Sequence, residues 1–269
     1  MSVSVTERPS PGRHGCAGTR DISHTATCRG GWHTAPVTSR PARSAARPPG
    51  PLEPLLALDA RLEGVWAWVQ AQMRPDAAHD DAHLLRVARW TLRCAPEVAP
   101  VLAVAAALTH DVVNLPKNHP QRAQASELGA QAVKEALPDL GFTPADAHEV
   151  ALAVRDHSYS RGAVPQTPLG AALQDADRLD ALGALGVLRV AGVGGQLGRA
   201  LLDPLDPWAQ AREPDDLAFT VDHFFTKLLR LEGTFHTPAG QAEARRRTRT
   251  MRAFLAELAS ELEVDPPGE

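Results

Sequence analysis

The chain has 269 residues, a net charge of −4 and three cysteines. This length suits one large domain or two small ones, and it is enough to bury a substantial core. Three cysteines are too few for a fold built on disulfides, which favours a cytoplasmic protein. The chain has no run of about 18 apolar residues and no apolar centre of a secretory signal, so we expect no membrane-spanning helix.

Residues 1–50 differ in composition from the rest of the chain. They are rich in Pro, Gly, Ser, Thr and Arg and have almost no large aliphatic side chains. Such a segment buries too little apolar surface to offset its ordering entropy, so we predict a disordered tail. Seven arginines against two acidic residues give this tail a net charge of +5, which leaves −9 for the remainder. Nucleic-acid binding by an acidic body is not expected, because it needs many cationic phosphate contacts.

Helical periodicity begins directly after this tail. Apolar residues recur at steps of three and four from Leu55 to Met73, which predicts one helix. A second helix is predicted over 82–94 and a third over 97–110, where Pro100 falls in the tolerated first turn. The third is apolar nearly all round, which is typical of a helix in the middle of a bundle.

The second half of the chain is also predicted to be helical. Its helices are expected at 123–137, after an N-cap at Thr143, from about 168, at 216–231 and at 237–263. The glycine-rich run at 183–202 is ambiguous, and we predict a helix that breaks around Gly194 and Gly195. We find no alternating strand pattern and no internal repeat, so the fold class is all-α. We place one folded domain at 51–264 and a C-terminal tail at 265–269.

Histidine and aspartate residues stand at the edges of three of these helices. His110 and Asp111 end the apolar third helix, His83 lies upstream, and Asp177 lies downstream. A mixed set of nitrogen and oxygen ligands without Cys suits Mn²⁺, Fe²⁺, Zn²⁺, Ni²⁺ or, less well, Mg²⁺. Neighbours inside a helix point about 100° apart, but at a frayed end both can face one ion. Four such ligands leave two octahedral positions for water and a phosphate oxygen.

The order of these residues resembles the HD-domain phosphohydrolase superfamily, whose pattern is H…HD…D on a helical bundle. Further segments look like one bacterial subgroup, whose better-known members are nucleoside triphosphate pyrophosphohydrolases. They are HDDAHLLRVARW, LTHDVVNLPKNHPQR, VRDHSYS, LQDADRLDALGALGVLRV and VDHFFTKLLRLEGTFHTPAGQAEARRRTRTMRAFL. The likeness covers roughly residues 55–263 in order, and it implies an HD-domain bundle with additional C-terminal helices.

The resemblance implies a set of metal ligands. Asp175 is an alternative to the last of them, but it lies two residues earlier and therefore about 200° round the helix. His79, one turn before His83, is an alternative to the first, although HLLRV fits the family's first segment better. The implied ligands are His83, His110, Asp111 and Asp177.

Other polar residues are candidates for binding or proton transfer. Lys117 and Arg122 follow the HD pair and could bind a polyphosphate tail, Arg by forking onto phosphate oxygens. His119 and His157 are candidates for a general acid or for phosphate hydrogen bonding. For these four the alternative is an exposed, solvated side chain. Two more, Arg178 and Asp180, are candidates for orienting Asp177 or neighbouring ligands.

The resemblance implies hydrolysis of nucleoside or deoxynucleoside triphosphates to monophosphate and pyrophosphate. Mn²⁺ is the favoured ion, with Mg²⁺, Fe²⁺, Ni²⁺ and Zn²⁺ as alternatives. The expected partner is a small-molecule nucleotide, and assembly into a homo-oligomer stays open. One rival hypothesis is another HD-type phosphomonoesterase or phosphodiesterase, such as a nucleotidase or a cyclic-nucleotide or oligonucleotide hydrolase. The other is a non-catalytic nucleotide-sensing module.

Overall fold

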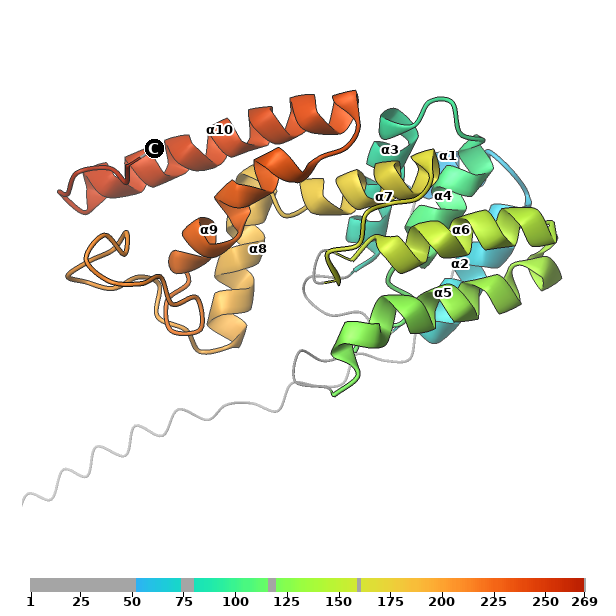
Figure 1. Cartoon of the computed structure of the whole chain (residues 1–269), viewed down its shortest axis with the longest axis horizontal. Helices are drawn as coiled ribbons and strands as arrows, with labels where there is room; N and C mark the ends of the chain where they lie inside the picture. Colours follow the sequence, from blue (N-terminus) through green and yellow to red (C-terminus); the bar gives the residue numbers. More distant parts are fainter. Residues whose placement is uncertain (1–51, 74–79, 116–119, 159–160, 269) are drawn as a thin grey trace, which may run out of the picture. The chain divides into compact units, whose positions relative to one another are not determined.

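The structure is a computed structural model that describes residues 52–73, 80–115, 120–158 and 161–268 (Figure 1). Within these ranges it contains ten α-helices joined by loops and 3₁₀ turns, and no strand. The described β-pairing is a single bridge between Ala200 and Phe219. The all-α prediction is therefore confirmed. The predicted tail at 1–50 lies outside the described residues, and the domain boundary at 51 stays a prediction.

Helix α4 is the centre of the first part of the bundle. It packs against α2, α3, α6 and α7, and every residue from Leu102 to Thr109 is buried. Pro100 is its first residue, as predicted. The bounds in this part are α1 Glu53–Leu56, α2 Arg61–Gln72, α3 Asp81–Cys94, α4 Pro100–Thr109, η2 Arg122–Gln124, α5 Ala125–Ala136, η3 Pro138–Leu140, α6 Pro144–Asp156 and α7 Pro168–Leu179.

Three helices begin with the same Thr-Pro pair. In α6, α7 and the later α10 (Pro238–Glu261), the threonine hydroxyl accepts a hydrogen bond from the backbone N–H three residues on, at 3.0 to 3.1 Å. The proline needs no backbone N–H at the first helical position, so the pair both starts and caps the helix. The caps are Thr143, Thr167 and Thr237.

The C-terminal helices form a second apolar cluster. Its elements are α8 Gly183–Gln196, α9 Asp222–Thr226, η5 Leu228–Thr234 and α10. Phe224, Leu231 and Met251 are among its fully buried side chains. Trp90 on α3 packs against both clusters, so the additional helices share an apolar contact with the first bundle.

Three predicted helices differ from the structure. The helix over 55–73 is interrupted before Arg61, where Asp59 accepts hydrogen bonds from the Arg61 backbone and guanidinium. Of the helix over 216–231, only α9 and η5 form, because the residues before α9 fold around the buried carboxylate of Asp222, which accepts from the Asp215 N–H. The predicted break at Gly194 and Gly195 is wrong, since α8 runs through both.

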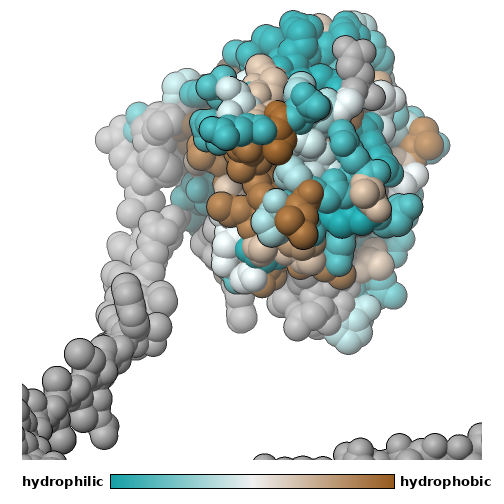
Figure 2. All heavy atoms as spheres, turned by 90° about the vertical axis from the view of Figure 1, so that its left-hand side faces the viewer, coloured by the Kyte–Doolittle hydropathy of each residue, from teal (hydrophilic) through white to brown (hydrophobic). Residues whose placement is uncertain are grey.

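Apolar side chains are exposed on the surface formed by α8 and the loop after it. Leu188, Leu201, Leu205 and Leu217 are each at least 70% exposed. Figure 2 shows hydrophobic side chains gathered among hydrophilic ones on this side of the molecule. Contiguous apolar surface is typical of interaction sites, so the homo-oligomer prediction stays open. None of the described helices is both long and apolar enough to cross a bilayer.

Candidate metal centre

The first histidine is positioned by the N-terminus of α3. The Asp80 side chain accepts a hydrogen bond from the His83 backbone N–H at 2.9 Å and so caps the helix. The His83 side chain is fully buried and lies where α3 packs against α4 and α7. Its Nδ1 lies 2.7 Å from Asp180 Oδ2. Because a carboxylate only accepts, Nδ1 is the donor, and Nε2 of the neutral ring has a lone pair.

The second histidine and its neighbour lie where α4 ends. His110 is the C-cap residue, and its Nδ1 lies 2.8 Å from the Ala107 carbonyl oxygen. A carbonyl oxygen also only accepts, so this ring too has its Nε2 lone pair available. Asp111 follows in the turn, and its Oδ2 comes within 3.2 Å of His110 Nε2. The helix end thus brings both side chains to one place.

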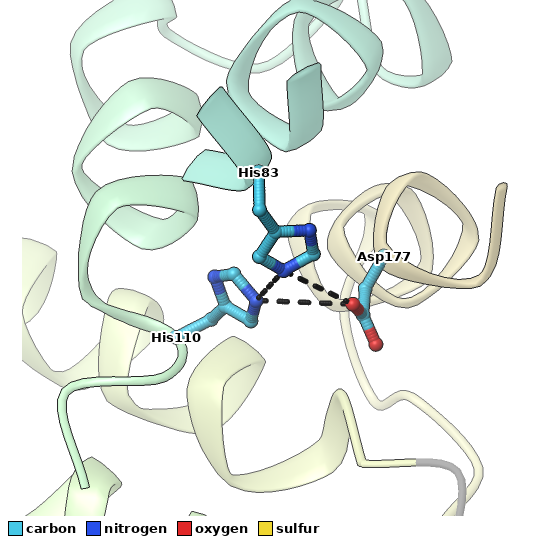
Figure 3. A group of neighbouring side chains, drawn as sticks. All are labelled: His83, His110 and Asp177. Atoms are coloured by element: carbon cyan, nitrogen blue, oxygen red, sulfur yellow. Dashed lines mark hydrogen bonds and ion pairs between the residues drawn. The ribbon is translucent and has the colours of Figure 1, made fainter. Parts of the chain in front are cut away.

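The side chains of α3, α4 and α7 converge on one point (Figure 3). His83 Nε2 and His110 Nε2 lie 3.1 Å apart. Asp177 Oδ1 lies 3.6 Å from the first and 3.8 Å from the second, and Asp111 Oδ2 lies 3.6 Å from His83 Nε2. One ligand atom from each of His83, His110 and Asp177 lies within 4.8 Å of the others, which suits a shared metal ion.

The donor chemistry also fits a cation. Both Nδ1 atoms donate, so two Nε2 atoms only 3.1 Å apart need either a proton on one of them or a cation bound to both. Burial opposes charge on His83, but contacts with Asp111 and Asp180 and the nearby Asp177 outweigh it and raise the His83 pKa to about 9. Burial likewise opposes charge on Asp111, yet the neighbouring His110 holds the Asp111 pKa well below its usual range. These surroundings favour a positive charge, which a divalent ion supplies.

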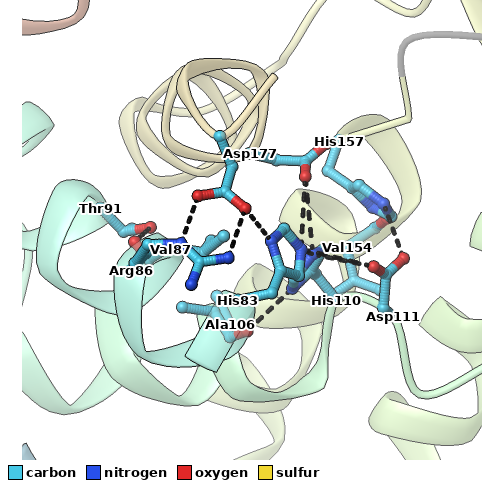
Figure 4. A network of polar contacts seen from close by, with 12 residues as sticks. His83, Arg86, Val87, Thr91, Ala106, His110, Asp111, Val154, His157 and Asp177 are labelled. Atoms are coloured by element: carbon cyan, nitrogen blue, oxygen red, sulfur yellow. Dashed lines mark hydrogen bonds and ion pairs between the residues drawn. The ribbon is translucent and has the colours of Figure 1, made fainter. Parts of the chain in front are cut away.

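His157 lies on the side of Asp111 that is opposite His110 (Figure 4). The Nδ1 atom of His157 lies 2.6 Å from the Val154 carbonyl oxygen, so Nδ1 is again the donor. Its Nε2 lies 3.7 Å from Asp111 Oδ1, and its ring centroid lies 5.0 Å from that of His110. His110, Asp111 and His157 form a second, overlapping group with metal-ligating spacing. Burial opposes charge on this ring too, but the contact with Asp111 raises the His157 pKa.

The structure separates the two aspartates that the sequence left as alternatives. Asp175 is fully buried and faces the start of α10, where its Oδ2 accepts from the Thr237 N–H and hydroxyl, both at 2.7 Å. Asp177, two residues on, faces the histidines. Three other candidates, His79, Lys117 and His119, lie outside the described residues. Arg122 begins η2, but its side chain is outside the described part.

Two cations beside His83 were not among the sequence candidates. Arg86 and Arg189 both contact Asp180, which the sequence suggested as an orienting residue. Arg189 is one of two charged residues, with Arg199, in the apolar, glycine-rich run at 183–202, and a charge within so apolar a segment is the signal that could have found it. The other suggested orienting residue, Arg178, donates to the Thr234 carbonyl oxygen at 2.6 Å.

Comparison with known proteins identifies the family. Residues 81–182, which contain all four converging side chains, match the HD domain family. YpgQ of Bacillus subtilis is 30% identical over 213 residues, which is 77% of this chain and 94% of YpgQ. The chain belongs to the HD-domain family.

Solved structures share this fold. The crystal structure of B. subtilis YpgQ in complex with ADP has a TM-score of 0.58 at 27% identity, covering 74% of this chain and 96% of that one. An HD-superfamily hydrolase from Bacillus thuringiensis has a TM-score of 0.60 at 27% identity, covering 77% of this chain and 98% of that one. The chain therefore has the fold of an HD-superfamily hydrolase, with a His and Asp group able to hold a metal ion.

Proposed function

We propose that this protein is a metal-dependent phosphohydrolase that converts nucleoside or deoxynucleoside triphosphates to monophosphate and pyrophosphate. The observation that supports this most is the pair of histidines whose Nε2 atoms face each other at 3.1 Å beside two carboxylates. The ADP bound to YpgQ supports a nucleotide as the ligand. A cytoplasmic location belongs to the same proposal.

Four side chains would hold the cation: His83, His110, Asp111 and Asp177. Mn²⁺ is our favoured ion because the ligands mix imidazole and carboxylate. When bound, such an ion lowers the pKa of a water molecule and polarises a phosphate oxygen. Asp111 has His83 and His110 on one side and His157 on the other. Asp111 would therefore link the cation to the His157 ring.

His157 is our candidate for proton transfer or for hydrogen bonding to phosphate. Its Nδ1 is bound to the Val154 carbonyl oxygen, so Nε2 is the atom that can hold or release a proton near Asp111. We further propose that Lys117 and Arg122 bind the polyphosphate tail and that His119 assists as an acid or hydrogen-bond donor. These three follow the HD pair closely in the chain.

A substrate panel with added Mn²⁺ tests the proposal. The panel contains ATP, dGTP, cyclic nucleotides and oligonucleotides, and pyrophosphate and orthophosphate are measured separately. We expect pyrophosphate from the triphosphates. Orthophosphate, or products from the cyclic or oligomeric substrates, would instead indicate another HD-type phosphatase or phosphodiesterase. Nucleotide-induced thermal stabilisation without any product would indicate a sensing module.

Substitution of the HD pair tests the site itself. We expect His110→Ala and Asp111→Ala each to abolish turnover while circular dichroism shows unchanged helicity. Wild-type rates in either purified variant would refute the assignment of the metal site.

A further inference from the structure

An ion-pair cluster lies directly behind the first histidine, on the side away from the converging ligand atoms. Asp180 follows α7 and is nearly fully buried. Its carboxylate accepts from Arg86 Nε at 2.6 Å and from Arg86 Nη2 at 2.9 Å. It also contacts the Arg189 guanidinium, which comes from α8. We call Asp180, Arg86 and Arg189 the Asp180 cluster.

The hydrogen-bond chemistry of this cluster sets the orientation of His83. Arg189 Nη1 also lies 3.2 Å from His83 Nδ1, but both a guanidinium and a donor Nδ1–H can only donate. The 2.7 Å contact between Nδ1 and Asp180 Oδ2 is therefore the hydrogen bond. Both guanidinium groups bind the same carboxylate, which holds it in place. The ring consequently presents its Nε2 lone pair to His110 and Asp177.

We propose that Asp180 is a positioning residue that sets the affinity of the site for its cation, and that Arg189 connects α8 to this task. Asp180 acts through His83. Carboxylates that accept from the distal nitrogen of a ligating histidine fix its tautomer and raise its basicity, and their loss typically lowers metal affinity about 10- to 100-fold. The inference rests on the proposed function, because it takes the four donors as the ligands.

A second buried ion pair in the same chain serves as a matched control. Asp222 is fully buried and accepts from both terminal nitrogens of Arg212, at 2.5 and 3.0 Å. Asp222 is the first residue of α9, in the C-terminal part of the fold. Its carboxylate also accepts from the backbone N–H of Asp215, in the loop before α9. A substitution there also removes a buried carboxylate, but it leaves the surroundings of His83 intact.

Isothermal titration calorimetry with Mn²⁺ on the metal-free full-length protein tests this role. We compare wild type with Asp180→Asn, Asp180→Ala, Arg189→Gln and Asp222→Asn, and we record the melting temperature of each. For Asp180→Ala we expect a dissociation constant for Mn²⁺ that is roughly 10- to 100-fold larger than that of wild type. We expect a smaller increase for Asp180→Asn and Arg189→Gln, and no change for Asp222→Asn. In ¹⁵N spectra of the imidazoles, the Nδ1–H signal of His83 should be lost or shifted in Asp180→Ala.

Each result decides the inference. Wild-type Mn²⁺ affinity in folded Asp180→Asn and Arg189→Gln would overturn it and leave the proposed function intact. Equal losses in the Asp180 and Asp222 variants would also overturn it, because they would reflect general destabilisation. If wild type itself bound no Mn²⁺, the proposed function would fail and this inference with it. The partly exposed Arg189 keeps the test informative if Asp180→Ala does not fold.

Discussion

Two aspartates separated by one residue have different tasks in this protein. Asp175 fixes the start of α10 by accepting from the N–H and hydroxyl of its cap residue Thr237, whereas Asp177 faces His83 and His110. The rotation of about 200° over two helical positions explains why one helix presents them in different directions. The sequence alone could favour Asp177 only through family resemblance, because the partner of Asp175 lies 62 residues further along the chain.

Substitution of Asp175 should therefore affect mainly stability, and substitution of Asp177 mainly activity. We predict that Asp175→Asn lowers the free energy of unfolding by about 1–3 kcal/mol, because an NH₂ donor replaces one of two oxygens that both accept from buried donors. Asp177→Asn should change the free energy of unfolding by only about 0.5 kcal/mol, because the Asp177 side chain is 27% exposed. The same substitution should abolish hydrolysis, because it alters a proposed metal ligand. Urea unfolding and a product assay measure the two effects. Equal destabilisation by both substitutions would contradict this division of tasks.

Helix α8 shows where sequence patterns were insufficient. Apolar composition alone indicated the buried α4, because a helix that is apolar all round has to be surrounded. Gly194 and Gly195 suggested a break, yet α8 continues through both, and Gly194 allows a close contact with another segment. A Cβ at Gly194 would overlap the Thr220 side chain, which the chain brings in from 26 residues later. Such contacts depend on the tertiary fold. The same is true of the hydrogen bond from the Asp215 N–H to Asp222, where the five-residue α9 begins.

Two glycines of α8 provide a paired test of this interpretation. We predict that Gly194→Ala destabilises the protein by about 1–3 kcal/mol, because the added methyl forces α8 away from Thr220. Gly192 has open space around its Cβ position, so Gly192→Ala should stabilise by about 0.5–1 kcal/mol through better helix propensity. Thermal and urea denaturation give both values. A stabilising Gly194→Ala would mean that the close contact with Thr220 is absent.

At the scale of the whole molecule, the proposed cation site links helices that are distant in sequence. The four side chains that we propose as ligands come from α3, from the end of α4 and from α7, and the Asp180 cluster adds α8. A cation bound there would therefore join α3, α4 and α7 directly, and it would reach α8 only through His83, Asp180 and Arg189. The folded state alone assembles this set, so binding should stabilise it against unfolding.

We predict that Mn²⁺ raises the melting temperature and that a chelator reverses the effect. At a free concentration of 100 times the dissociation constant, the gain is about 2.7 kcal/mol. The Asp177→Asn variant should show a smaller gain, because it lacks one donor. Differential scanning calorimetry over a Mn²⁺ series measures this. An equal rise in the variant would indicate that the stabilising ion binds elsewhere.

The most direct test of the shared cation site is anomalous diffraction from crystals grown with Mn²⁺. We predict one strong anomalous peak bounded by His83 Nε2, His110 Nε2 and carboxylate oxygens of Asp111 and Asp177. A peak bound by other residues, or no peak at this place in protein that hydrolyses nucleotides with Mn²⁺, would contradict the assignment.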